Sequence, residues 1–180
     1  MGSPKALLRY GNETFLDTLT SLFHERCAAV IVVLGAQAAE IRAAAIRPAT
    51  FVVNADYALG MTTSLQCGLR AIPPDADGVL FTLVDHPAAS PATIDAVLAG
   101  IDSGRQPLLR VPRYHGKRGH PIWFSRALIP EFLALPPAGP ARDVVARHVD
   151  RTDYLDLEDP GIVADIDSPE DYRTLIGATV

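Results

Sequence analysis

Asp85 and His86 follow the apolar stretch VLFTLV at residues 79–84 and are followed in turn by Pro87. A run of apolar residues with almost no alternation is typical of a strand buried on both faces, as in the parallel sheets of α/β proteins. Ligands of such sheets bind outside the carboxyl ends of the strands, so these side chains are placed for chemistry. The alternative is structural: Asp85 caps the next turn and Pro87 ends the strand. This segment alone favours neither interpretation.

Two other predicted strand ends carry polar side chains. Asn54 ends the stretch TFVVN, and Asp165 and Asp167 lie near the end of the chain in DIDSPED. In a parallel sheet these ends share one edge, where carboxylates can hold a divalent cation. Mg²⁺ prefers oxygen ligands and usually takes one or two protein carboxylates when substrate phosphates supply the rest. Asp85 and Asp167 are therefore a candidate metal pair, although Asp165 and Asp167 by themselves fit a helix cap equally well.

A glycine precedes a predicted helix in ADYALGMTTSLQCG, where Gly60 leads into Met61, Thr62, Thr63 and Ser64. The N-terminus of a helix presents free N–H groups and the positive end of a dipole, which suit a phosphate or the edge of a base. The competing interpretation is that the hydroxyl side chains are ordinary caps and that Met61 belongs to the core.

Basic and imidazole side chains gather around two glycines in RYHGKRGHP, in a sequence that is otherwise acidic. A hairpin of this composition could hold a phosphate-bearing substrate, whereas a solvent-exposed turn would also account for it. His120 before Pro121 is less expected of a turn, because it fixes an imidazole at the start of the next strand. The residues concerned are Arg113, His115, Lys117, Arg118 and His120.

Strand-like and helix-like patterns alternate along the chain, which predicts an α/β fold with a mostly parallel sheet flanked by helices. Strands are expected at 29–34, 50–54, 79–84 and 153–157, with helices at 15–23, 38–45, 61–72, near 94–98, at 127–135, at 141–148 and from Ser168 onward. Residues 107–125 read as two extended pieces around a glycine-bearing turn. The sequence contains no linker or internal repeat, so residues 1–180 are expected to form a single domain.

The net charge, the length of the apolar stretches and the cysteine content exclude several classes of protein. The 180 residues carry a net charge of −5, which argues against a nucleic-acid or anionic membrane surface. The longest apolar stretch, residues 27–36, is far too short to cross a bilayer. Cys27 and Cys67 have no metal-ligand spacing, which indicates small buried thiols in a reducing, cytoplasmic compartment.

The ordered set of motifs resembles the molybdenum cofactor cytidylyltransferases, within the wider Rossmann-like nucleotidyltransferase superfamily. The similarity covers essentially the whole chain, and its most specific elements are Gly-Met-x-x-Ser-Leu, Asp-x-Pro and Gly-His-Pro. The matching stretches are MGSPKALLRYG, VVLG, VVNADYALGMTTSLQCGL, LVDHP, GKRGHPIWFSRAL and DIDSPEDY.

The resemblance implies that a phosphate of molybdopterin attacks the α-phosphorus of CTP and releases pyrophosphate, with Mg²⁺ as cofactor. Such catalysis depends mainly on alignment and charge neutralisation. Asp85 would bind the metal and Asp167 would complete its site, while Lys5 would neutralise the triphosphate. The nucleotide would contact Asn54, Gly60, Met61 and Ser64, and the pterin would contact Gly119, His120 and Pro121.

The sequence departs from the family pattern in two places. His86 stands where the family more often has Gln, and the sequence begins at the tail of the family's first signature. The first strand, the glycine loop and its arginine are therefore expected to be absent, through a start assigned too far downstream or through shortening. The strands on either side of that position would then have unpaired edges. A non-catalytic carrier of the pterin dinucleotide for a molybdoenzyme, and a nucleotidyltransferase for another phosphorylated substrate, are the alternative functions.

Overall fold

The computed structural model describes residues 4–101 and 107–177, in which short strands alternate with helices for most of the length. The α-helices are α1 (Phe15–His24), α2 (Ala38–Ala44), α3 (Met61–Arg70), α4 (Pro91–Leu98), α5 (Ile129–Leu133), α6 (Arg142–Arg147) and α7 (Pro169–Gly177). The strands are β1 (Arg9–Tyr10), β2 (Glu13–Thr14), β3 (Ile31–Leu34), β4 (Thr50–Val53), β5 (Gly78–Phe81), β6 (Leu109–Tyr114), β7 (Lys117–Arg118), β8 (Ile122–Ser125) and β9 (Thr152–Asp156).

Helix α1 is fixed at its start by a threonine cap and a buried carboxylate. The Thr14 hydroxyl accepts the Asp17 N–H at 3.0 Å and donates to the Asp17 carboxylate at 2.7 Å. The same carboxylate accepts the backbone N–H groups of Ile46 and Arg47 at 3.0 and 3.1 Å. Asp17 is 2% exposed, and the hydrogen bonds to its carboxylate compensate for burying it. They join α1 to the end of α2.

The strands form an antiparallel β1–β2 pair, a parallel β3–β4 pair and a mixed five-stranded sheet in the order β5-β8-β6-β7, with β9 parallel to β6. The α/β fold class is confirmed, and so are the two extended pieces around a turn, which are β6–β7 and β8. β8 runs antiparallel to both β5 and β6, which gives the sheet its mixed character. The largest core cluster packs α3, α5 and α6 against this sheet around Phe124, Phe132 and Val144.

Strand β5 ends at Phe81, so the predicted strand through Val84 is wrong at its end. Phe81 pairs with Ile122, and the residue before Ile122 is Pro121, which has no N–H to donate. The ladder therefore stops there, and residues 82–84 continue as irregular backbone toward Asp85. Apolar composition alone could not locate this end, because it reflects burial rather than pairing.

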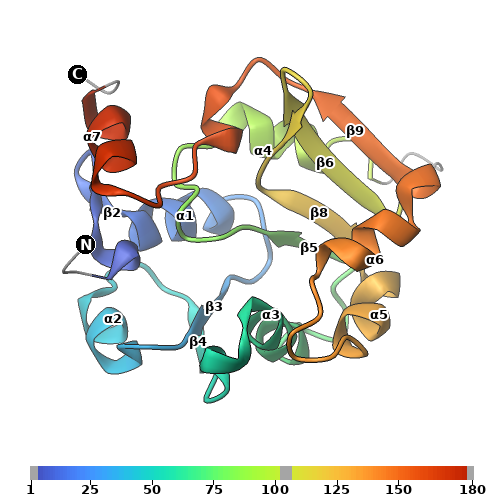
Figure 1. Ribbon diagram of the computed structural model, residues 1–180, viewed down its shortest axis with the longest axis horizontal. Coiled ribbons are helices and arrows are strands. Elements are labelled where there is room, and N and C mark those ends of the chain that lie inside the picture. The colour runs from blue at the N-terminus through green and yellow to red at the C-terminus, as the bar shows by residue number, and fades with distance from the viewer. Residues whose placement is uncertain (1–3, 102–106, 178–180) are drawn as a thin grey trace.

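An apolar groove of about 700 Å³ lies between the β3–β4 pair and the five-stranded sheet. Residues 28–33 and 75–84 form its two long walls. In the described part of the chain, β3 pairs with β4 alone and β5 pairs with β8 alone, so each strand has one edge without a strand partner. The sequence predicts such unpaired edges. Figure 1 shows the β3–β4 pair with α2 on one side and the larger sheet with α5 and α6 on the other.

The first and last helical segments lie side by side, as Figure 1 shows for the N-terminal segment and α7. The Tyr172 hydroxyl donates to the backbone oxygen of Arg9 at 2.9 Å, and its ring meets that of Phe15 at 6.0 Å between centroids. This contact brings Lys5 and the residues just before α7 to the same end of β5.

Candidate functional site

Lys5 lies between two carboxylates that are distant from it in the sequence. Its ammonium donates to Asp85 at 3.1 Å and to Asp167 at 2.6 Å. Burial alone would lower the pKa of Lys5, but the hydrogen bonds to Asp167 and Asp85 raise it above its ordinary value. The side chain therefore stays charged at neutral pH. The structure thus brings together Asp85 and Asp167, which the sequence pairs, and Lys5, which the resemblance adds to them.

A second set of side chains shares Asp85. Asp85, His86 and Asp165 each offer a ligand atom, and these atoms lie within 4.8 Å of one another. Burial first, and then the carboxylates of Asp85 and Asp167, raise the pKa of Asp165. Asp85 Oδ1 and His86 Nδ1 are inaccessible to solvent and have no hydrogen-bond partner in the described structure. A divalent cation would give these atoms the partner that they lack, so the donor set fits a metal.

The structure places Asp165 in this set instead of Asp167, which the sequence favours. Asp167 has 71% of its side chain exposed and reaches toward Lys5. The capping alternative for these aspartates is also resolved. Helix α7 is capped by Ser168, whose hydroxyl accepts the Asp171 N–H at 3.1 Å and donates to its carboxylate at 2.7 Å.

His120 packs beside this group. Its ring lies 4.7 Å from that of His86 and 5.8 Å from that of Phe81, measured between centroids. Burial, and then the neighbouring His86, lower the pKa of His120 to about 4, so the imidazole is neutral at pH 7. The backbone N–H of His120 donates to the Ile162 oxygen at 2.9 Å, which holds the Gly-His-Pro segment against residues 160–162.

Gly119 is required by this close approach. A Cβ at Gly119 would lie 2.5 Å from the backbone oxygen of Ile162, closer than real Cβ atoms come. Pro121 follows a cis peptide bond. The Gly-His-Pro segment is thus placed beside Asp85 and His86, where the resemblance expects the second substrate.

A separate group forms around the start of α3. The Asn54 amide donates to the hydroxyls of Thr63 and Ser64, both at 2.9 Å, and its oxygen accepts the Asp56 N–H at 3.0 Å. Asn54 is 6% exposed. Its three hydrogen bonds hold the loop after β4 to the first turn of α3, so in this structure Asn54 positions the predicted nucleotide loop.

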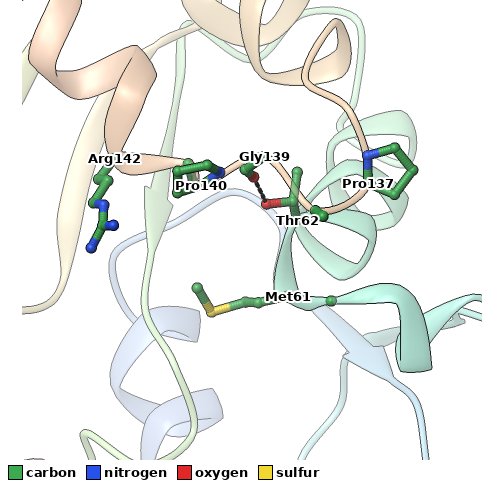
Figure 2. Close-up of a pocket in the computed structure, with 9 residues that line it drawn as sticks. Met61, Thr62, Pro137, Gly139, Pro140 and Arg142 are labelled. Carbon is green, nitrogen blue, oxygen red and sulfur yellow. Dashed lines mark hydrogen bonds between the residues drawn. The ribbon is translucent and has the colours of Figure 1, made fainter.

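A pocket of about 280 Å³ opens beside Gly60, Met61 and Thr62, as Figure 2 shows. Its other wall is the segment 137–142, to which the Thr62 hydroxyl donates at the Gly139 oxygen. Met61 is 56% exposed, so it is available for contact and is not a core residue. Binding pockets for drug-sized ligands are roughly 300 to 1,000 Å³, so this one suits a single ring system such as a base.

The 700 Å³ groove extends from the start of α3 to the segment before Asp85, because Met61, Ser64 and Val84 all line it. The predicted site residues therefore lie at two neighbouring positions, one after β4 and one after β5. The roles assigned to them stay predictions.

The basic hairpin is partly committed to structural contacts. Arg113 forms two hydrogen bonds with the Asp156 carboxylate, at 2.9 and 2.8 Å, and stacks over Tyr154 at 4.9 Å. Arg118 also lies over the Tyr154 ring, at 5.2 Å. These contacts favour a structural role for Arg113 over a phosphate contact.

Sequence reasoning missed the segment 137–142, and it paired Asp167 with Asp85, whereas the compact cluster contains Asp165. The stretch PPAGPARD had a visible signal, because its prolines and glycine mark an irregular loop. Nothing in that stretch indicates that it faces the start of α3.

Comparison with known proteins identifies relatives over almost the whole length. Residues 1–152 match the MobA-like NTP transferase domain. The chain is 32% identical to nicotine blue oxidoreductase of Paenarthrobacter nicotinovorans, over 96% of this chain and 88% of that protein. It is 28% identical to the molybdenum cofactor cytidylyltransferase of Escherichia coli K12, over 97% of this chain and 88% of that protein.

Among solved structures, the manganese complex of Rv0371c from Mycobacterium tuberculosis H37Rv superposes with a TM-score of 0.78 at 31% identity, covering 98% of this chain and 93% of that one. Within residues 4–101 and 107–177, no helix has the length and apolar character needed to span a bilayer.

Proposed function

The chain belongs to the MobA-like NTP transferase family, and from this premise we propose that it transfers CMP from CTP to a phosphate of a molybdopterin-type cofactor. The acceptor phosphate oxygen forms a bond to the α-phosphorus of CTP, and the bond from that phosphorus to the bridging oxygen breaks. Pyrophosphate leaves, and the product is molybdopterin cytosine dinucleotide. The 28% identical cytidylyltransferase supports this choice of nucleotide and acceptor.

The observation that carries the proposal is the ion-paired group of Lys5, Asp85 and Asp167, and Val84, the neighbour of Asp85, lines the same groove as Met61. Phosphoryl transfer is catalysed mainly by positioning and by neutralising charge on the phosphates. Lys5 provides a fixed positive charge at the edge of the sheet, and on nucleotide binding its ammonium exchanges a carboxylate for a phosphate oxygen.

Divalent metal chemistry suits the same place. Asp85, His86 and Asp165 would hold the ion, and Asp167 would orient Lys5 beside it. When bound, such an ion would supply positive charge that stabilises the negative charge developing on the phosphates. The proposed cofactor is a divalent ion, of which Mg²⁺ is the one that the resemblance implies, and the manganese complex of the Rv0371c protein supports a divalent ion in this family.

In this proposal CTP and the pterin bind at different groups of side chains. The base lies in the pocket at Gly60 and Met61, and the ribose lies toward Ser64. The pterin lies against Gly119, His120 and Pro121, where the neutral His120 ring offers an apolar face and a hydrogen-bonding nitrogen.

Cellular context follows from the substrates. Cys27 and Cys67 are free thiols, which fits the cytoplasmic location expected for a CTP-dependent enzyme. A molybdoenzyme that accepts the finished dinucleotide is the expected protein partner.

Oxidoreduction is the second candidate, because the 32% identical relative is named nicotine blue oxidoreductase. The ammonium of Lys5 and the carboxylates that could hold a metal ion favour transfer, because a lysine and a bound cation neutralise negative charge on phosphates. The test is pyrophosphate release from CTP and from GTP in the presence of molybdopterin and a divalent cation. Release with CTP that is lost in Asp85→Asn and kept in His24→Gln, a change at an exposed residue of α1, supports the proposal. Release from neither nucleotide contradicts it.

A further inference from the structure

We propose that the imidazole of His86 is a direct ligand of the metal, together with Asp85 and Asp165, and that the site therefore prefers a first-row transition ion such as Mn²⁺ to Mg²⁺. The inference rests on the proposed function for the purpose of the ion. It is tested by metal binding without nucleotide, so the two can fail separately.

The first support is the geometry of the donor atoms. Ligand atoms of Asp85, His86 and Asp165 lie within 4.8 Å of one another. Bonds of about 2.0 to 2.2 Å to one ion place ligand atoms roughly 3 to 4 Å apart. A small closing movement of these side chains therefore completes a three-ligand site, and the remaining positions stay open to substrate oxygens.

The second support is independent of the spacing. Asp85 Oδ1 and His86 Nδ1 are both shielded from solvent, and neither has a hydrogen-bond partner within the described residues. Buried polar atoms in folded proteins nearly always have a partner. Two such atoms on adjacent residues, each residue belonging to the donor set, indicate a partner that is neither protein nor bulk water.

The third support is the balance of charge. Three carboxylates, those of Asp85, Asp165 and Asp167, surround one ammonium, that of Lys5. The group is therefore short of positive charge while Lys5 is its sole cation among the described contacts. A divalent ion supplies the difference without requiring a further basic residue.

The identity of the ion follows from the chemistry of the ligand. Mg²⁺ favours oxygen ligands and keeps much of its water, whereas imidazole suits first-row transition ions. A neutral imidazole is needed, and the ring of His86 is held in place by the ring of His120 at 4.7 Å. His120 acts here as a positioning residue. The change His86→Gln would replace this nitrogen by an amide oxygen of similar reach and remove the preference.

The experiment measures metal binding to the full chain after removal of metals by chelation. Mn²⁺ titration followed by electron paramagnetic resonance gives the bound fraction, and competition with Mg²⁺ gives the preference. Pulsed measurements of the bound Mn²⁺ detect a histidine nitrogen if one is coordinated. The variants are His86→Gln and the exposed control His24→Gln.

The expected result is one Mn²⁺ per chain, a histidine nitrogen coupling in the native protein, and at least a 10-fold preference over Mg²⁺. In His86→Gln the coupling disappears and Mn²⁺ affinity falls about 10- to 100-fold, while Mg²⁺ affinity changes less than two-fold. His24→Gln matches the native protein throughout. The nitrogen signal of the native protein does not depend on how any variant folds.

An Mn²⁺ complex without histidine coupling overturns the inference, and so does a coupling that survives in His86→Gln. Equal affinities for Mn²⁺ and Mg²⁺ in the native protein also overturn it. If the coupling is present but no pyrophosphate is released from CTP, the metal site stands and the proposed function fails. If CTP is turned over but the bound ion has oxygen ligands alone, the proposed function stands and the inference about His86 fails.

Discussion

Replacing Asn54 by alanine separates a structural role from a direct contact with the nucleotide. The sequence predicts contact, whereas the structure uses three hydrogen bonds of the side chain to join the loop after β4 to α3. If the structural role is right, the change destabilises the protein, and it weakens nucleotide binding only through movement of the α3 start.

The magnitude follows from the bonds lost. Each hydrogen bond contributes about 1 kcal/mol, so losing three lowers the free energy of unfolding by about 3 kcal/mol. For a chain of this size each kcal/mol shifts the melting temperature by roughly 2 to 4 °C, which gives a decrease of about 6 to 12 °C. The matched control is Asn12→Ala, because Asn12 is an exposed asparagine in the turn between β1 and β2.

Thermal melts and CTP titration by calorimetry, run on the same preparations, give the answer. We expect Asn54→Ala to melt well below the native protein and Asn12→Ala to melt within about 2 °C of it, the spread expected for surface changes. A native melting temperature combined with lost CTP binding would refute the reasoning, because it would show that the Asn54 side chain contacts the nucleotide.

Three further predictions concern Asp85, Gly161 and Asp159. Asp85→Asn should reduce nucleotidyl transfer by roughly 100-fold or more while leaving the melting temperature nearly unchanged, and near-native turnover would rule out its role at the phosphates. Gly161→Ala should lower the melting temperature by several degrees, because its Cβ would lie 2.0 Å from the Ala88 backbone oxygen. Gly177→Ala, with nothing within 4 Å of its Cβ, is the control, and equal melting of the two variants would contradict the clash. Burial raises the pKa of Asp159, but hydrogen bonds from Thr93, Ser90 and Gly161 together outweigh burial and hold the pKa below its ordinary value of 3.8. The stability that it contributes is therefore complete above that value and is lost as the pH falls through the lower pKa of the folded state. Urea unfolding at a series of pH values from neutral down to strongly acidic should show a shallower acid decline in Asp159→Asn, and superimposable profiles would refute this.

Much of the fold could be predicted, because hydrophobic periodicity reports burial directly. Helix α4 has the predicted cap: the Ser90 hydroxyl accepts the Thr93 N–H at 3.2 Å, and Pro91 is the first helical residue. The sequence predicts strand β5 too long, because Leu83 and Val84 are apolar without being paired in a sheet, and Val84 packs against a core cluster. That distinction depends on β8, which lies much later in the chain, at Ile122–Ser125.

The candidate site was predictable in its chemistry but not in its detail. Asp85 follows β5 after a short irregular segment, close to where the sequence predicts the strand to end, and Lys5 reaches it across a separation of 80 residues, a contact in line with the resemblance. The choice between Asp165 and Asp167 could not be made, because residues two apart in an extended segment share a face and the spacing does not distinguish them. The sequence assigns Asn54 to the nucleotide, since its two hydroxyl partners become visible only when α3 is placed beside it.

Transfer of labelled CMP tests the central claim most directly. The protein is incubated with CTP carrying ³²P at the α-phosphate, with molybdopterin, and with Mn²⁺ or Mg²⁺, and the products are separated and counted. The account predicts that the label moves to the pterin and that one pyrophosphate is released for each label transferred. Label that stays in CTP, or that appears only as free CMP, would contradict it.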